Sequence, residues 1–187
     1  MKNGFTHLNF SKKNFGGFTL IELLVVAVII SILTGFILAN YPSIGREFAL
    51  QRSANKLAQD IRKVQGNAVA MKEISGSLPE GYGVYLNKVS FQYSYKLFAD
   101  EDGNYRWESA TDTLVEMVSF ESNVKINDLK IDGISTDTLN IVFEPPDPTI
   151  WINNFSSSSS TITLQLETDP NKTKTISVNS SGLITTE

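Results

Sequence analysis

An apolar run close to the N-terminus constrains this chain more than any other feature. Residues 18–39 contain a single charge, Glu22. As a helix, with a rise of ~1.5 Å per residue, the run would be about 33 Å long, which is enough to cross the hydrocarbon core of a bilayer. It is longer than the core of an ordinary secretory signal, and no clean small-residue cleavage site follows it. The run therefore predicts a membrane-spanning helix.

Glu22 is the residue of this helix that needs an explanation. Burying a carboxylate in hydrocarbon costs about 2.5–3.5 kcal/mol even on insertion scales. Two accounts are open: Glu22 lies close enough to the interface to reach headgroup water, or a cation inside the membrane neutralises it. The nearest candidate cation is an α-amino group, which would arise if the chain were cut just before Phe18.

The residues around that position resemble a known processing signal. Lys-Lys-Asn-Phe-Gly-Gly at 12–17, followed by Phe-Thr-Leu-Ile-Glu at 18–22, is similar to the class III signal of type IV pilins and type II secretion pseudopilins. The resemblance implies that a prepilin peptidase cuts between Gly17 and Phe18 and N-methylates Phe18. It also implies an assembly role for Glu22, which would neutralise the N-terminal amine of an adjacent subunit.

The net charge of the chain changes sign at the same position, after residue 17. Residues 1–17 hold three lysines and no acid, a charge of +3, which leaves 13 basic and 20 acidic residues and a charge of −7 for the remainder. Lys12 and Lys13 favour a cytoplasmic N-terminus, although Arg46 and Arg52 lie on the other side of the run. The resemblance implies the leader inside and the domain outside. An acidic domain argues against nucleic acid as a partner, a competence pilus excepted.

Catalytic residues are not predicted anywhere in the chain, and we do not expect an enzyme. The chain has no cysteine, and its single histidine, His7, belongs to the leader. The common nucleophile–base pairs and zinc sites built from His or Cys are therefore excluded from the remainder. Many pilins close a C-terminal loop with a disulfide, and this chain departs from that pattern.

A second helical segment, residues 40–75, follows the apolar run. Pro42 leaves two alternatives, an interrupted helix from 18 to about 71 or a true break. One stripe of apolar residues at spacings of three and four predicts packing onto a sheet; its members are Leu50, Ala54, Leu57, Ile61, Val64, Ala68 and Met71. Residues 52–68 also resemble the helix of H-type minor pseudopilins, with matches at Leu57-Ala58, Asp60-Ile61-Arg62 and Ala68.

Beyond Pro79 the apolar period changes from 3.6 to 2, which predicts strands. The expected strands are 82–89, 91–98, 114–120, 124–127, 139–143, 161–166 and 173–178, with the last two forming a hairpin. A helix followed by strands predicts an α+β fold, a long N-terminal helix packed on antiparallel sheets, as in pilins. The expected divisions are a cleaved leader at 1–17, a transmembrane or filament-core helix at 18–39, an amphipathic helix at 40–75 and a β-rich domain at 76–187.

An acidic segment begins at the end of one expected strand. Asp100, Asp102, Asn104 and Glu108 offer the oxygen ligands that a Ca²⁺ ion would use. The glycine and the final ligand are out of place for a standard calcium loop, however, and Asp-Gly or Gly-Asn would also make a plain hairpin turn. Both interpretations are open, with the turn preferred. The aromatic residues beside it, Tyr105 and Trp107, would form a contact surface or cap the sheet.

Together these features predict a structural subunit, a minor pilin or pseudopilin of a type II secretion pseudopilus or a type IV pilus. The expected partners are other pilin or pseudopilin subunits, the prepilin peptidase, an inner-membrane assembly platform and the membrane. No cofactor is required, with Ca²⁺ as the exception to test. The expected location is the bacterial inner membrane, crossed once, with incorporation into a periplasmic or extracellular filament. The alternative is a single-pass, membrane-anchored binding module with a β-rich domain.

Overall fold

The computed structural model describes residues 17–147, 149–156 and 158–187, with the side chains of residues 39–44 left out. Most of the predicted leader, residues 1–16, lies outside the described residues. The chain divides into two compact units, Met1–Pro42 and Ser43–Glu187. In the described residues the first unit contributes the start of helix α1 (Leu20–Val69), and the second contributes the rest of α1 and all the strands. The α+β fold class is confirmed.

Helix α1 continues through Pro42 and ends at Val69, close to the predicted end near residue 71 and before the end of the predicted division at 40–75. Gly66 and Asn67 lower the helix propensity of the last turn. The backbone then turns left-handed at Met71, with φ 44°. The Lys72 N–H donates to the Asn67 carbonyl at 3.1 Å, which satisfies one of the last helical acceptors. The chain therefore leaves the helix about ten residues before Pro79, where the apolar period changes.

The first sheet has the strand order β3-β2-β1-β6-β7, and every neighbouring pair is antiparallel. Three of its strands were predicted close to their true positions: β1 (Gly81–Asn87), β3 (Thr113–Ser119) and β6 (Thr138–Glu144). β2 (Ser94–Asp100) starts later than predicted, because residues 91–93 form a turn before it. The edge strand β7 (Thr149–Ile152) was missed.

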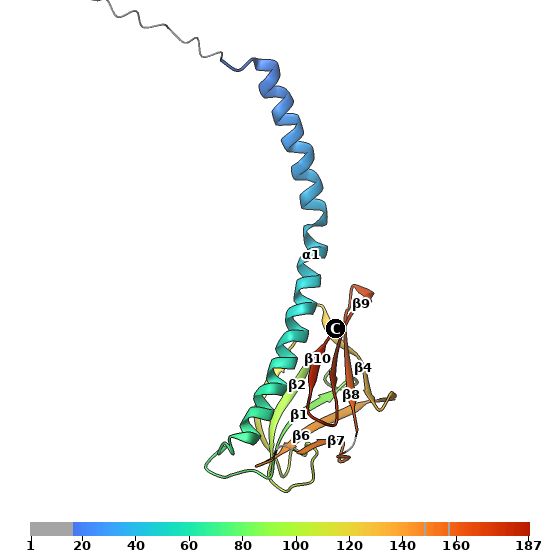
Figure 1. Cartoon of the computed structure of the whole chain (residues 1–187). Helices are drawn as coiled ribbons and strands as arrows, with labels where there is room; N and C mark the ends of the chain where they lie inside the picture. The colour runs from blue at the N-terminus through green and yellow to red at the C-terminus, as the bar shows by residue number, and fades with distance from the viewer. Residues whose placement is uncertain (1–16, 148, 157) are drawn as a thin grey trace, which may run out of the picture. The chain divides into compact units, whose positions relative to one another are not determined.

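The second sheet has the order β10-β9-β8-β4-β5 and is also antiparallel (Figure 1). The predicted hairpin is confirmed as β8 (Ser160–Leu166) and β9 (Asp169–Val178). β4 (Val124–Ile131) extends further than predicted, and it pairs with the short β5 (Ile134–Thr136). The C-terminal β10 (Ile184–Thr186) was missed along with β5.

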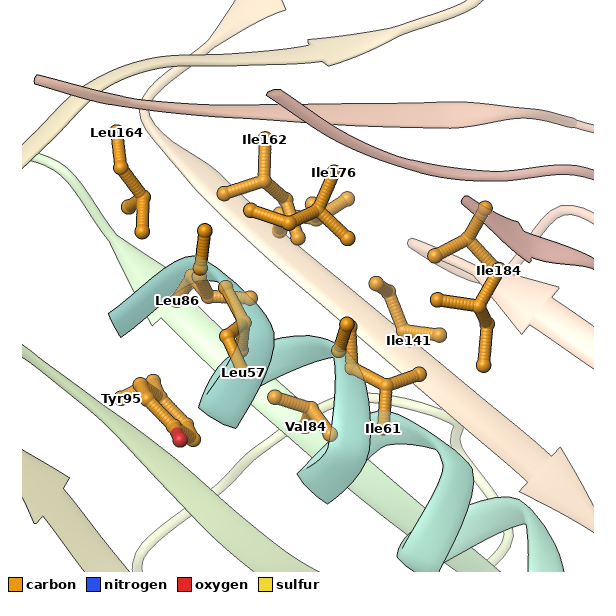
Figure 2. Packing of buried hydrophobic residues seen from close by; sticks show 14 of the residues in the cluster. Leu57, Ile61, Val84, Leu86, Tyr95, Ile141, Ile162, Leu164, Ile176 and Ile184 are labelled. Carbon is orange, nitrogen blue, oxygen red and sulfur yellow. The ribbon is translucent and has the colours of Figure 1, made fainter. Parts of the chain in front are cut away.

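The apolar stripe of α1 and the inner faces of both sheets share one core. Leu57 and Ile61 are fully buried. Figure 2 shows them close to Val84 of β1, with Ile162 of β8 and Ile176 of β9 on the opposite side of the same cluster. At roughly 25 cal/mol per Å² of buried apolar surface, this cluster is the main stabilising element of the second unit. The predicted packing of the stripe onto a sheet is confirmed, with one exception: Met71 lies beyond the helix and is exposed.

Polar contacts fix the same helix at its sides. Asp60, almost fully buried, accepts a hydrogen bond of 2.6 Å from the Tyr95 hydroxyl. The Arg62 guanidinium donates to the Ile184 carbonyl at 3.0 Å, and Gln65 donates to the Gly182 carbonyl at 3.3 Å. Asp60 and Arg62, which match the H-type motif, therefore connect the helix to the first sheet and to the C-terminal strand, and Gln65, which departs from the motif, adds a contact to the turn before that strand.

Candidate functional site: the N-terminal assembly segment

The helix starts with a reciprocal cap between Thr19 and Glu22. The Glu22 N–H donates to Thr19 Oγ1 at 3.3 Å, while the Thr19 N–H and hydroxyl each lie 3.5 Å from Glu22 Oε2. This is the capping-box arrangement, in which a Thr and a Glu three residues apart satisfy each other's backbone donors. Phe18, 84% exposed, immediately precedes it. Glu22 therefore has a local structural role that the charge argument did not reveal, although the Thr-x-x-Glu spacing could have shown it.

The helix beyond this cap presents apolar side chains on every face. Its segment Leu20–Leu38 is long and apolar enough, by length and composition, to cross a membrane, and none of it is buried within the chain. Within this segment the Ser31 hydroxyl donates a hydrogen bond to the Ala27 carbonyl at 2.8 Å. A donor satisfied inside its own helix is compatible with a hydrocarbon environment. The predicted apolar helix is confirmed.

This geometry leaves the Glu22 carboxylate able to bind a cation. Its contacts with Thr19 are at the 3.5 Å limit of hydrogen bonding, and both come to one of its two oxygens. The other oxygen, Oε1, takes no part in the cap. A carboxylate has room for several donors, so an ammonium group could bind Glu22 while the cap remains in place.

The acidic segment belongs to a different part of the chain. It is a loop, residues 101–112, that joins the antiparallel neighbours β2 and β3, so the connection is longer than the plain hairpin turn that was preferred. Asx-type bonds shape it: Gly103 N–H donates to Asp100 Oδ1 at 2.9 Å and Tyr105 N–H donates to Asp100 Oδ2 at 2.8 Å. Left-handed backbone at Gly103 and Tyr105 permits these bonds.

The aromatic residues of this loop cap the sheet. The Trp107 ring meets that of Phe98 edge-on with centroids 5.5 Å apart, and the Tyr105 ring stacks on Trp151 at 4.2 Å. The Trp107 N–H donates to the Asn140 side chain at 2.9 Å. Of the two alternatives for these aromatic residues, capping is the one that the structure shows.

The carboxylates that come together are Asp100, Asp102 and Asp112, whose oxygens all lie within 4.8 Å of one another. Asp112 takes the place expected for Glu108, which contributes its backbone N–H to Asp112 at 2.7 Å. Asn104 binds Asp102 through its side chain at 3.0 Å. Asp112 lies one position beyond the last ligand of a standard calcium loop, so a search at fixed spacing missed it. The calcium site stays a prediction, and a comparison of thermal unfolding with calcium and with chelator would test it.

Burial raises the pKa of Asp100 to about 6. The backbone N–H groups of Tyr105 and Gly103 lower the pKa of this carboxyl, and Asp102 and Asp112 raise it, but the loss of solvation is the largest effect. Burial also raises the pKa of Asp112.

Comparison with known proteins bears mainly on the N-terminal segment. The family model described as the prokaryotic N-terminal methylation motif matches residues 12–38. Two crystal structures of the type IV minor pilin FimU of Pseudomonas aeruginosa (strain PAO1) are distantly similar. One aligns with 12% identity and a TM-score of 0.48, covering 74% of this chain and 87% of that chain. The other has 10% identity and a TM-score of 0.47, covering 74% and 92%. No curated protein matches significantly.

The motif match falls on the segment that resembles a class III signal. It includes Gly17, Phe18 and Glu22 and continues to the end of the exposed apolar helix. A membrane-length helix alone would be weak evidence, because signal sequences and core helices share its composition. Motif and helix occur here together, ahead of an α+β domain. This chain therefore begins with a prokaryotic N-terminal methylation motif, and an α+β domain follows it.

Proposed function

We propose that this chain is a minor subunit of an envelope-spanning filament, either a type II secretion pseudopilus or a type IV pilus. The observation that carries the proposal is the start of α1: a Gly17–Phe18 junction, a cap at Thr19 and Glu22, and an apolar helix exposed on all sides. A helix that is apolar all round needs lipid or other helices to cover it. The resemblance of residues 52–68 to H-type minor pseudopilins supports a minor subunit.

Assembly would follow from processing at the junction. Cleavage after Gly17 by a prepilin peptidase frees the amine of Phe18, which is then N-methylated and remains a cation. Glu22 of an adjacent subunit accepts this cation through the oxygen that the Thr19 cap leaves available. In a medium of low dielectric constant the attraction between the two charges is much stronger than in water. The pair would offset part of the cost of placing either charge in hydrocarbon.

The same scheme predicts the location of the chain and its partners. Before assembly the chain crosses the inner membrane once, with Ser43–Glu187 outside the cytoplasm, and an inner-membrane platform passes it into the filament. The role is structural, and the apolar helices pack against those of other pilin or pseudopilin subunits. The N-terminal methylation motif at residues 12–38 supports these partners in general terms.

The Glu22→Gln variant separates charge from capping. Glutamine also serves in a capping box, so the helix start is preserved while the charge is lost. We expect processed Glu22→Gln protein to remain in the membrane fraction and to be depleted from filaments. The control is Glu47→Gln, which removes an exposed glutamate that pairs with Lys172 at 2.8 Å outside the apolar run.

Two outcomes would count against the scheme. If Glu22→Gln protein enters filaments as efficiently as the wild type, the pairing with Phe18 is wrong. Recovery of the wild-type protein as a lone monomer with an uncut leader would favour the anchored binding module instead.

A further inference from the structure

The outer edge of the first sheet exposes apolar side chains. β3 pairs with β2, and among the described residues no strand pairs with its other side. Leu114, Val115 and Met117 are 47%, 44% and 50% exposed. Long apolar edge strands are uncommon in soluble domains, because their free backbone groups recruit other strands. This edge lacks the lysine or proline that would block such pairing.

The backbone of β3 is oriented to accept another strand. The Phe120 N–H donates to the Tyr93 carbonyl at 2.9 Å just beyond the end of the strand. Bonded and non-bonded pairs alternate along an antiparallel ladder, so the backbone groups of Ser119 and Met117 turn away from β2. Val115 lies at the register shift, where the partners of β3 change from Leu97 to Phe98.

The two faces of the edge differ in chemistry. Met117 lies opposite Lys96, and Leu114 lies opposite Phe98, whose ring packs against Trp107 away from the core. Glu116 belongs to the face toward α1, where its carboxylate is 3.5 Å from Lys63 Nζ. A strand added here would meet apolar side chains on one face and a carboxylate on the other.

We propose that β3 receives an additional strand, an extended segment of a neighbouring filament subunit in which apolar and cationic residues alternate. The apolar residues would cover Leu114 and Met117, and the cation would lie beside Glu116. Strand addition of this kind takes its affinity from main-chain hydrogen bonds and its specificity from alternate side chains. A second copy of β3 fits less well, because aligning two copies antiparallel over 113–119 places Glu116 opposite itself. The inference rests on the proposed function.

Site-specific crosslinking of the full-length protein in its host membranes tests the proposal. The chain has no cysteine, so Met117→Cys can carry a benzophenone label alone. The control is Leu183→Cys, which is 59% exposed and lies between β9 and β10. We expect a crosslink to a different subunit from position 117 and none from position 183. Crosslinks to β3 of a second copy, equal crosslinks from both positions, or none from either would overturn the proposal.

A proline tests the hydrogen bonds of the edge. With the label moved to Val115→Cys, Met117→Pro removes an outward N–H and leaves the bonds to β2 intact, as proline permits on edge strands. We expect the crosslink yield to fall about five- to tenfold relative to Met117→Ala, the loss of roughly one hydrogen bond. If Met117→Pro does not fold, Glu116→Lys is the substitute, since it should repel the cation. An unchanged yield in the folded variant would overturn the inference.

The intact mass of the same samples separates the two proposals. A chain that is processed at Gly17 and enters filaments, but gives no crosslink at β3, overturns only the strand addition. A chain that retains its leader overturns the proposed function.

Discussion

Asp100 is a buried carboxyl group whose titration should be visible in the stability of the domain. Its pKa is raised from 3.8 to about 6, chiefly by burial. Between these values the folded state holds a proton that the unfolded state has released, so the free energy of unfolding falls as the pH rises and levels off above about 6. We expect a loss on the order of 2 kcal/mol across this window.

Urea unfolding at several pH values, compared between the wild type and Asp100→Asn, isolates this effect. Asparagine cannot titrate, and it keeps one of the two acceptors used by Gly103 and Tyr105. We expect Asp100→Asn to be less stable overall, with a shallower decline from about pH 4 to pH 6. Equal slopes in the two proteins would show that Asp100 is not the titrating group.

The role of an individual residue could be predicted where its chemical type differs from that of its neighbours in the sequence. Glu22 could be identified because it is the only charge in residues 18–39. Thr19 was overlooked because its role depends on a cap of hydrogen bonds rather than on charge. Asp112 could not be placed, since the path of the loop across the sheet brings it to Asp100 and Asp102.

Among the elements, the contact between α1 and β2 makes a sharp test of stability. Tyr95 is 1% exposed and donates to Asp60 at 2.6 Å, whereas Tyr93 is 44% exposed and donates to Glu167 at 2.8 Å. We expect Tyr95→Phe to lower the free energy of unfolding by about 1–3 kcal/mol, because a buried carboxylate loses a donor. Tyr93→Phe, a matched loss at the surface, should change it by less than about 0.5 kcal/mol. Equal effects measured by denaturant unfolding would contradict the assigned burial.

Helices and strands could be predicted where a periodic apolar pattern continues over many residues, and the shortest strands could not. The stripe of α1 from Leu50 to Ala68 is buried as expected. β5, β7 and β10 have three, four and three residues, which is too short for an alternation to stand out. Phe91 and Tyr93 continue the alternation of Tyr95 and Leu97 in the sequence but precede β2, so the strand was predicted to begin where a turn exists.

At the scale of the whole molecule, the division at Pro42 predicts a domain that folds without its anchor. The core residues run from Ala49 to Ile184, all within Ser43–Glu187. We expect a fragment of residues 43–187 to be soluble, to unfold cooperatively on heating and to retain near-ultraviolet circular dichroism. A fragment that binds hydrophobic dyes and melts without a transition would show that the core needs the N-terminal helix.

The proposed function depends on processing between Gly17 and Phe18, and the intact mass of the protein from its own membranes would show whether this cleavage occurs. Fragmentation of the N-terminus would locate the first residue and any added methyl group. We predict a chain that begins at Phe18 and is heavier by one methyl group. A chain that still begins at Met1 would contradict the filament account.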